Sequence, residues 1–174
     1  MSIAIIEDYF KHNDLEEIFK KKPKKPKRLE RFLRMDYSNP IYKEEANISN
    51  PNDTPSRRKI YEGNDILNKP TGFNTYLGTL TTKQDRHPNA GILEFPEHRK
   101  GGSPYRNLTP RECFLLMGFD EADFNKVLKY NPQLQKNKKL YSRERLERLA
   151  GNSIVVDVLV AIFKQIKELK FLIY

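Results

Sequence analysis

The chain has 174 residues, enough for one compact core but few for a multidomain enzyme. Lysine and arginine outnumber aspartate and glutamate by 32 to 23, and the formal charge of +9 points to a partner that carries phosphates. The only cysteine is Cys113, so a disulfide framework is excluded. With three histidines and no CxxC spacing, we expect no metal site.

The N-terminal segment, residues 1–28, is predicted to hold short helices and a basic linker. Ile3, Ile6 and Phe10 have the spacing of one helix face. The opening MSIAIIEDYF has acids where a signal peptide has bases, and the apolar runs look shorter than a membrane span. We therefore expect a cytoplasmic protein with no membrane partner.

Most of the net charge lies in one tract. From Lys20 to Arg34, nine basic residues accompany a single acid, which gives a local charge of +8. The tract either binds phosphates or is a solvated arm, and its two prolines exclude a continuous helix.

Residues 29–105 are rich in Pro, Asn, Gly and Thr, and their apolar runs are short. The stretches RRKIYEG, TYLGTLTT and AGILEF predict short strands joined by long irregular loops, which often carry binding surfaces. The stretch GTLTTKQDR combines threonine hydroxyls with Lys83, Gln84 and Arg86, which suits phosphate contacts and some base-edge reading. An exposed polar strand end has the same composition.

The chain becomes helical after Ser103. Thr109 at the N-cap, Pro110 at the first helical position and Glu112 three residues after the cap form a helix start, and Gly118 ends that helix. A second helix is expected near residues 121–128. Cys113 lies inside the first helix, so we expect it to pack as a small hydrophobic residue.

Two further helices complete the prediction. One starts at Ser142 and buries Leu146 and Leu149; the last begins after Asn152 or Ser153. The last helix has an apolar stripe formed by Val155, Val158, Leu159, Ile162, Phe163, Ile166 and Leu169. Ser153 can cap it, and Asn152 can offer a donor and an acceptor to a polar ligand at its N-terminus. An ordinary capped helix is the alternative.

Taken in order, GTLTT, YRNLTPRECFLLMGF and LAGNSIVVDVL resemble the C-terminal part of a cytosine-5 DNA methyltransferase. The last two stretches resemble the final signature blocks of that family, and PSRRKIYEG and TGFNTYLGTLTT resemble its variable target-recognition domain. The resemblance covers residues 29–166. It implies an α+β chain with a small strand-rich target-recognition domain with long loops at 29–105. The helices of 106–174 would then complete a partner's doubly wound α/β methyltransferase domain.

The family flips cytosine out of DNA and methylates it with S-adenosylmethionine, using the cysteine of a Pro-Cys pair. This chain contains no Pro-Cys pair, Phe-x-Gly-x-Gly loop, Glu-Asn-Val block or Gln-x-Arg-x-Arg block. It therefore resembles the second subunit of a split enzyme, inactive alone, in a bacterial restriction-modification system. A non-catalytic DNA-binding remnant and a fragment of an RNA cytosine methyltransferase are the alternatives.

The resemblance also implies roles for individual residues. Those expected to touch S-adenosylmethionine are Asn152, Ser153 and Val155. Those expected near double-stranded DNA are Thr79, Leu80, Thr81 and Thr82, to which side-chain chemistry adds Lys83 and Arg86. Arg106 and Glu112 are expected to brace the recognition domain. A catalytic subunit would cover the apolar stripe of the last helix, and without it the chain is expected to self-associate.

Overall fold

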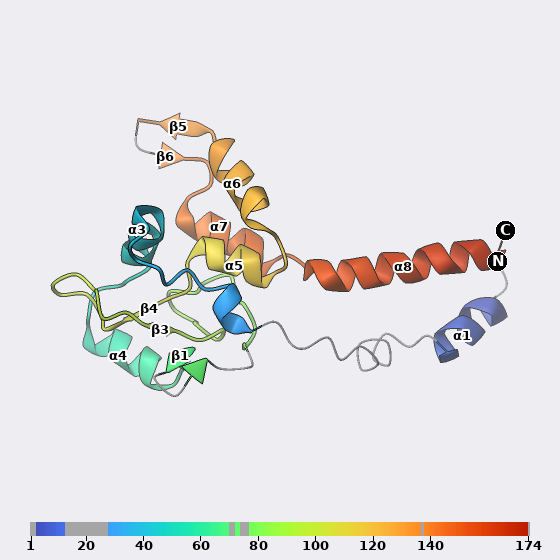
Figure 1. The fold of residues 1–174 in the computed structure, drawn as a ribbon, viewed down its shortest axis with the longest axis horizontal. Coiled ribbons are helices and arrows are strands. Elements are labelled where there is room, and N and C mark those ends of the chain that lie inside the picture. Colours follow the sequence, from blue (N-terminus) through green and yellow to red (C-terminus); the bar gives the residue numbers. More distant parts are fainter. Residues whose placement is uncertain (1–2, 13–27, 70–71, 74–76, 137, 174) are drawn as a thin grey trace. The chain divides into compact units, whose positions relative to one another are not determined.

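The computed structural model describes residues 3–12, 28–69, 72–73, 77–136 and 138–173 (Figure 1). The chain forms two compact units, Arg28–Ser153 and the pair of terminal segments Met1–Lys27 and Ile154–Tyr174. The larger unit runs across the boundary that we expected at residue 105. The stretch Lys20–Lys27 of the basic tract lies outside the described residues.

Short helices and very short strands make up the first part of the larger unit. The helical elements are η1 (Leu29–Arg31), α3 (Pro40–Ile48) and α4 (Pro55–Glu62). The strands form two antiparallel pairs, β1 (Asn68–Lys69) with β2 (Gly72–Phe73) and β3 (Leu93–Glu94) with β4 (Tyr105–Arg106). An isolated parallel bridge between Ile66 and Ile92 joins the β1 region to the β3 region.

The recognition region contains fewer strand residues and more helix than predicted, although the chain as a whole is α+β. RRKIYEG lies in α4, because the Thr54 side chain accepts from the Arg57 N–H and Pro55 takes the first helical position. Asn39 and Pro40 start α3 in the same way. TYLGTLTT contains no strand over its described residues 77–82, whereas AGILEF does contain β3.

The helices after residue 106 follow the prediction closely. They are α5 (Pro110–Leu116), α6 (Glu121–Lys129) and α7 (Arg143–Gly151). Thr109 and Glu112 form the predicted capping box, and Gly118 has the positive φ of 91° that favours glycine at a helix end. Leu149 was predicted to be buried, but it is 46% exposed. An antiparallel hairpin of β5 (Gln133–Gln135) and β6 (Lys138–Lys139) was not predicted.

One hydrophobic core joins the two parts of the larger unit. It takes apolar side chains from the recognition region and from α5, α6 and α7, including Leu67, Leu80, Leu93, Leu108, Cys113, Phe114, Phe124, Leu146 and Ala150. Helices α5, α6 and α7 and the recognition region therefore fold as one unit.

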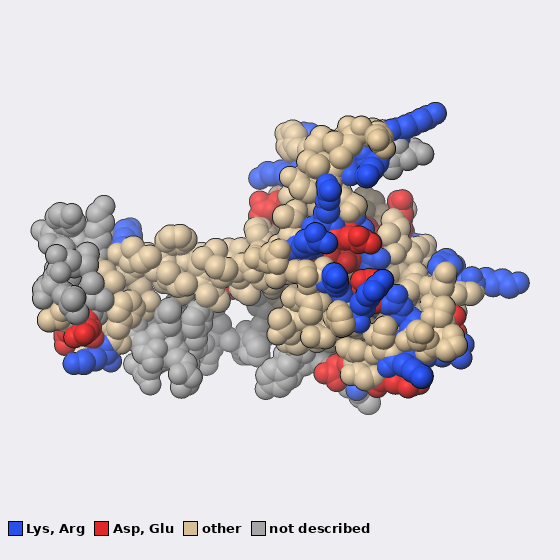
Figure 2. Space-filling model, turned by 180° about the vertical axis from the view of Figure 1, so that it is seen from behind, with Lys and Arg blue, Asp and Glu red and all other residues tan. Residues whose placement is uncertain are grey.

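The smaller unit contains α1 (Ile3–His12) and α8 (Val156–Ile173). The Tyr9 hydroxyl donates to Glu168 Oε2 at 2.9 Å, which joins the two helices. Apolar side chains of α8 are exposed, with Phe163 at 63% and Ile166 at 52%, and the face seen in Figure 2 is mostly uncharged along this helix. The predicted stripe is thus present on a single long helix.

The prediction that no apolar run approaches membrane length needs correction. The helical stretch Arg143–Leu169 includes a window that is long and apolar enough to cross a membrane, by length and composition only. These two properties do not distinguish a spanning helix from one that packs on another protein chain.

Candidate nucleic-acid and cofactor site

The segment 77–82 meets the end of α7 at Gly151. A Cβ atom on Gly151 would lie 2.9 Å from the carbonyl carbon and oxygen of Thr81 and 3.0 Å from the backbone nitrogen of Thr82. Two backbones approach this closely only where no side chain intervenes. The structure thus brings two separately predicted regions together, the segment expected near DNA and the signature block expected near the cofactor.

The same segment is held on its other side by residues 87–89. A Cβ atom on Gly78 would lie 2.0 Å from the carbonyl oxygen of Asn89, so this position also admits only glycine. The Thr81 hydroxyl donates to the His87 carbonyl at 2.7 Å. These contacts fix residues 78–82 although they form no strand.

Of the residues expected near DNA, Thr79, Lys83 and Arg86 are exposed, Thr81 and Thr82 are half-buried and Leu80 is buried. Gln84, which we considered for base reading, is fully buried and donates to the Thr81 carbonyl at 2.8 Å. That interpretation of Gln84 is wrong, because its amide supports the backbone of the segment.

The signature block around Asn152 differs in detail from the prediction. The Ser153 hydroxyl donates to the Ala150 carbonyl at 2.8 Å, so it closes α7 and does not cap α8, which begins at Val156. The Asn152 side chain is exposed, and no described residue forms a hydrogen bond with its amide. A free donor and acceptor therefore stand next to the Gly151 contact.

Val155 belongs to the smaller unit, whereas Asn152 and Ser153 belong to the larger one. The Val155 carbonyl accepts from Val158 at 3.0 Å and from Leu159 at 3.2 Å, so it forms the first turn of α8. Its side chain is 37% exposed. This position at a helix N-terminus agrees with the role that the resemblance implies but does not establish it.

Arg106 and Glu112 form a fully buried ion pair. Arg106 Nη1 and Nη2 each donate to a different Glu112 oxygen at 2.8 Å, which is the bidentate geometry that favours such pairs. Burial raises the pKa of Glu112, but Arg106 and the N–H groups of Thr109 and Arg34 outweigh burial and hold that pKa below its ordinary value. The Tyr37 hydroxyl accepts from Arg106 Nε at 3.0 Å.

Arg111 forms a second network that sequence reasoning missed. Its guanidinium donates to Glu45 of α3, to Glu121 of α6 and to Asn125, and it lies 4.7 Å from the Phe124 ring centroid. The side chain is only 4% exposed. Its position directly after the helix-starting proline gave no signal of this role, because its hydrogen-bond partners lie in other elements, 10 to 66 residues away in the sequence.

Cys113 and Glu147 are buried next to these networks. Burial and the nearby carboxylates of Glu147 and Glu112 raise the pKa of the Cys113 thiol well above its ordinary value. Burial also raises the pKa of Glu147, although Arg143 Nη2 lies 2.7 Å from Glu147 Oε1 and opposes the shift. A thiol in this setting stays protonated and packs, as predicted from its place in the helix.

Residues 4–168 match the C-5 cytosine-specific DNA methylase family. An orphan methyltransferase of Bacillus phage rho11s is 42% identical over 82 residues, which are 47% of this chain and 13% of that protein. A type II methyltransferase of Lactococcus lactis subsp. cremoris is 39% identical over 92 residues, which are 53% of this chain and 22% of that protein. The matched stretches thus span less than a quarter of these relatives.

A solved structure shows the same fold. The chain aligns with the Dnmt2 methyltransferase of S. pombe with a TM-score of 0.51 and 21% identity, over 91% of this chain and 44% of that one. At this identity the likeness concerns the fold and not the substrate.

Proposed function

Because the chain belongs to the C-5 cytosine-specific DNA methylase family, we propose that it is one subunit of a split DNA (cytosine-5-)-methyltransferase. In this proposal the chain recognises DNA and completes the cofactor pocket, and a second polypeptide supplies the catalytic cysteine and the glycine-rich loop. We place the enzyme in the cytoplasm of a bacterium with a restriction-modification system. The finer parts of this proposal rest on the family resemblance and on the contacts described above.

One observation carries the proposal. Gly151 lets the end of α7 pack directly on the backbone of Thr81 and Thr82, which joins the expected DNA-contacting segment to the expected cofactor-contacting block. Such a junction would hold a flipped base in a fixed position beside a methyl donor, which supports the proposal.

The residues present suit S-adenosylmethionine, which supplies the electrophilic methyl group when it is bound. The Asn152 amide is exposed and has no hydrogen-bond partner among the described residues, so it can accept from an ammonium group or donate to a carboxylate. The Val155 turn at the start of α8 presents helix N-terminal amides, which favour a carboxylate. In this proposal the chain contributes residues that bind the cofactor, and methyl transfer requires residues that this stretch does not contain.

The exposed apolar side chains of α8 are assigned to the catalytic subunit in this proposal. Phe163 and Ile166 are more than half exposed, and covering them would remove apolar area from water. Without the partner, we expect the chain to self-associate through these side chains in a concentration-dependent manner.

The test is reconstitution. The chain is co-expressed with a polypeptide that carries the early signature blocks, and methyl transfer from labelled S-adenosylmethionine to double-stranded DNA is measured for each chain alone and for the mixture. Transfer only in the mixture supports the proposal. Transfer by this chain alone would contradict it, and specific DNA binding without transfer in any mixture would support the non-catalytic alternative.

A further inference from the structure

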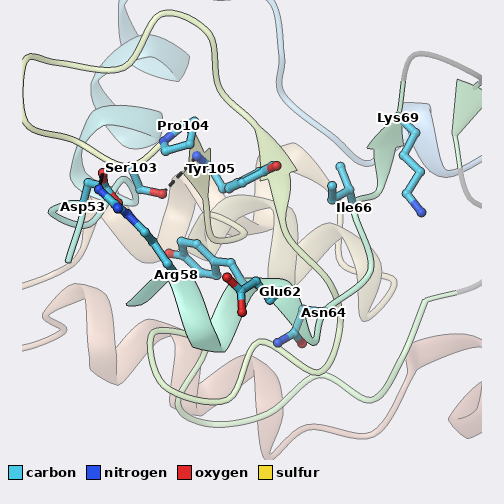
Figure 3. A pocket seen from close by; sticks show the side chains of 10 residues that line it. Asp53, Arg58, Glu62, Asn64, Ile66, Lys69, Ser103, Pro104 and Tyr105 are labelled. Carbon is cyan, nitrogen blue, oxygen red and sulfur yellow. Dashed lines mark hydrogen bonds and ion pairs between the residues drawn. The ribbon is translucent and has the colours of Figure 1, made fainter. Parts of the chain in front are cut away.

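A pocket of about 600 Å³ lies in the recognition region, away from the Gly151 junction (Figure 3). Its walls come from α4, from the segment that leads into β1, and from the residues around β4. The lining side chains used below are Asp53, Arg58, Tyr61, Glu62, Lys69 and Tyr105. The family resemblance assigned no role to any of them.

The charge of the pocket lining does not favour a phosphate. Two acids, Asp53 and Glu62, balance two bases, Arg58 and Lys69, so the lining lacks the positive excess that a phosphate favours. The rings of Tyr61 and Tyr105 pack edge to face with centroids 5.9 Å apart. Hydrogen-bond donors and acceptors therefore stand beside an aromatic wall.

Arg58 is held by one edge of its guanidinium. Nε donates to Asp53 Oδ1 at 2.9 Å and Nη2 donates to Asp53 Oδ2 at 2.6 Å (Figure 3). The Asp53 N–H in turn donates to the Gly101 carbonyl at 3.0 Å, which anchors the pair to a neighbouring loop. The long Arg58 side chain is thus positioned before any ligand arrives, which reduces the entropy lost on binding.

The other edge of the guanidinium has no partner among the described residues. No described residue accepts from Nη1, and the Arg58 side chain is 64% exposed although both ends of the Asp53 carboxylate hold it. Two parallel N–H groups, one on Nη1 and one on Nη2, remain available in a single plane. This fork matches the O6 and N7 acceptors that guanine presents in the major groove of DNA.

We propose that Arg58, oriented by Asp53, reads a guanine of the DNA target. The proposal rests on the function proposed above, because it needs a duplex against the recognition region. It differs from the basic tract and from the segment 77–82, which are expected to contact the phosphate backbone and carry no sequence information.

The experiment selects duplexes from a randomised library with the full-length chain and four variants. Arg58→Ala removes the fork, Arg58→Lys keeps the charge but loses bidentate geometry, and Asp53→Asn keeps Arg58 but loosens its orientation. Lys59→Ala is the matched control, since Lys59 is exposed on the same helix and does not line the pocket. Circular dichroism checks that each variant is folded.

The wild-type chain and the Lys59 variant should enrich one guanine position that both Arg58 variants lose. Loss of a bidentate contact is expected to weaken binding to the preferred duplex by roughly ten- to a hundredfold. Replacing that guanine with 7-deazaguanine, which lacks the N7 acceptor, should weaken the wild-type chain and leave Arg58→Ala unaffected. Asp53→Asn should fall between wild type and Arg58→Ala.

Two results would overturn the inference. If Arg58→Ala weakens all sequences equally and lowers the salt dependence, Arg58 contacts phosphate. If Arg58→Ala keeps the wild-type preference, another residue reads the base. In both cases the wild-type chain still selects a sequence, so the proposed function stands; a wild-type chain that selects no sequence would count against the proposed function as well.

Discussion

Charged residues differ in burial between two parts of the larger unit, the region around α5 and the region around α4. Around α5 the arginines are buried and paired: Arg106 with the buried Glu112, and Arg111 with the partly exposed Glu45 and Glu121. Around α4 the Arg58 side chain pairs with Asp53 but is 64% exposed, and its Nη1 has no acceptor among the described residues. Figure 2 shows basic and acidic side chains interleaved on one face of this unit. Buried pairs therefore serve the fold, and open pairs remain available to a ligand.

The largest effect should come from breaking the buried pair. Glu112→Ala leaves the Arg106 guanidinium buried without a counter-ion and should lower the free energy of unfolding by about 3–5 kcal/mol. Asp53→Ala is the matched variant in the open pair and should cost much less, because solvent screens an exposed pair. Chemical denaturation of both variants measures the contrast. Equal losses would show that burial does not separate the two kinds of pair.

Acid should act on the same buried pair. The pKa of Glu112 is held below its ordinary value of 4.5, so its stabilising contribution is present above that value and is lost as the pH falls through the folded-state pKa. Thermal melts between about pH 7 and pH 3 should therefore show a loss of stability. Glu147→Gln should still show this loss, because burial raises the pKa of Glu147 and acid relieves its cost. Glu112→Gln should show less of it.

The Gly151 junction should matter for activity. Gly151→Ala places a methyl group within 3.0 Å of the Thr81 and Thr82 backbone and should displace segment 77–82. We expect a loss of roughly tenfold or more in methyl transfer by the reconstituted enzyme, since small misplacements of reacting groups are costly. Gly63→Ala is the control, because nothing lies within 4 Å of a Cβ atom there.

How far the sequence predicted the fold depended on the range of the interactions. The start of α5 was predicted residue by residue, because Thr109, Pro110 and Glu112 act within one turn. Helix α4 was missed although Thr54 and Pro55 signal it, since the short apolar run in RRKIYEG was given more weight than the cap. The burial of Gln84 depends on the packing of segment 77–82, which local patterns do not reveal.

The candidate site was predicted by resemblance more than by pattern. Asn152 was named from a signature block and Thr81 from the resemblance to a target-recognition domain, and the structure places their segments in contact through Gly151. The direction of the Ser153 hydroxyl, toward α7 and not α8, depends on where the helix boundary falls. Arg58 was not predicted, because an exposed arginine is informative only once Asp53 and the pocket are seen around it.

A smaller effect is expected for Asn152→Ala. Loss of one hydrogen-bonding side chain from the cofactor should raise the KM for S-adenosylmethionine in the reconstituted enzyme by about tenfold, while the KM for DNA stays unchanged. Initial rates at varied cofactor and fixed DNA measure it. An unchanged cofactor KM would remove Asn152 from the pocket.

The smallest effect is expected from the tract Lys20–Lys27. Reversing its charges should flatten the dependence of DNA affinity on salt without altering the preferred sequence, because each phosphate contact releases counterions. Filter binding over a range of salt concentrations measures the slope. An unchanged slope would identify the tract as a solvated arm.

The close approach at Gly151 has a consequence for exchanging specificities between relatives. Residues 78–82 fit between Gly151 on one side and Asn89 on the other with no room for an added methyl group. If a chimaera replaced the whole recognition region, the new backbone would have to reproduce the contacts with both Gly151 and Asn89. Replacing only the residues before 77 would leave residues 78–82, Gly151 and their contacts in place.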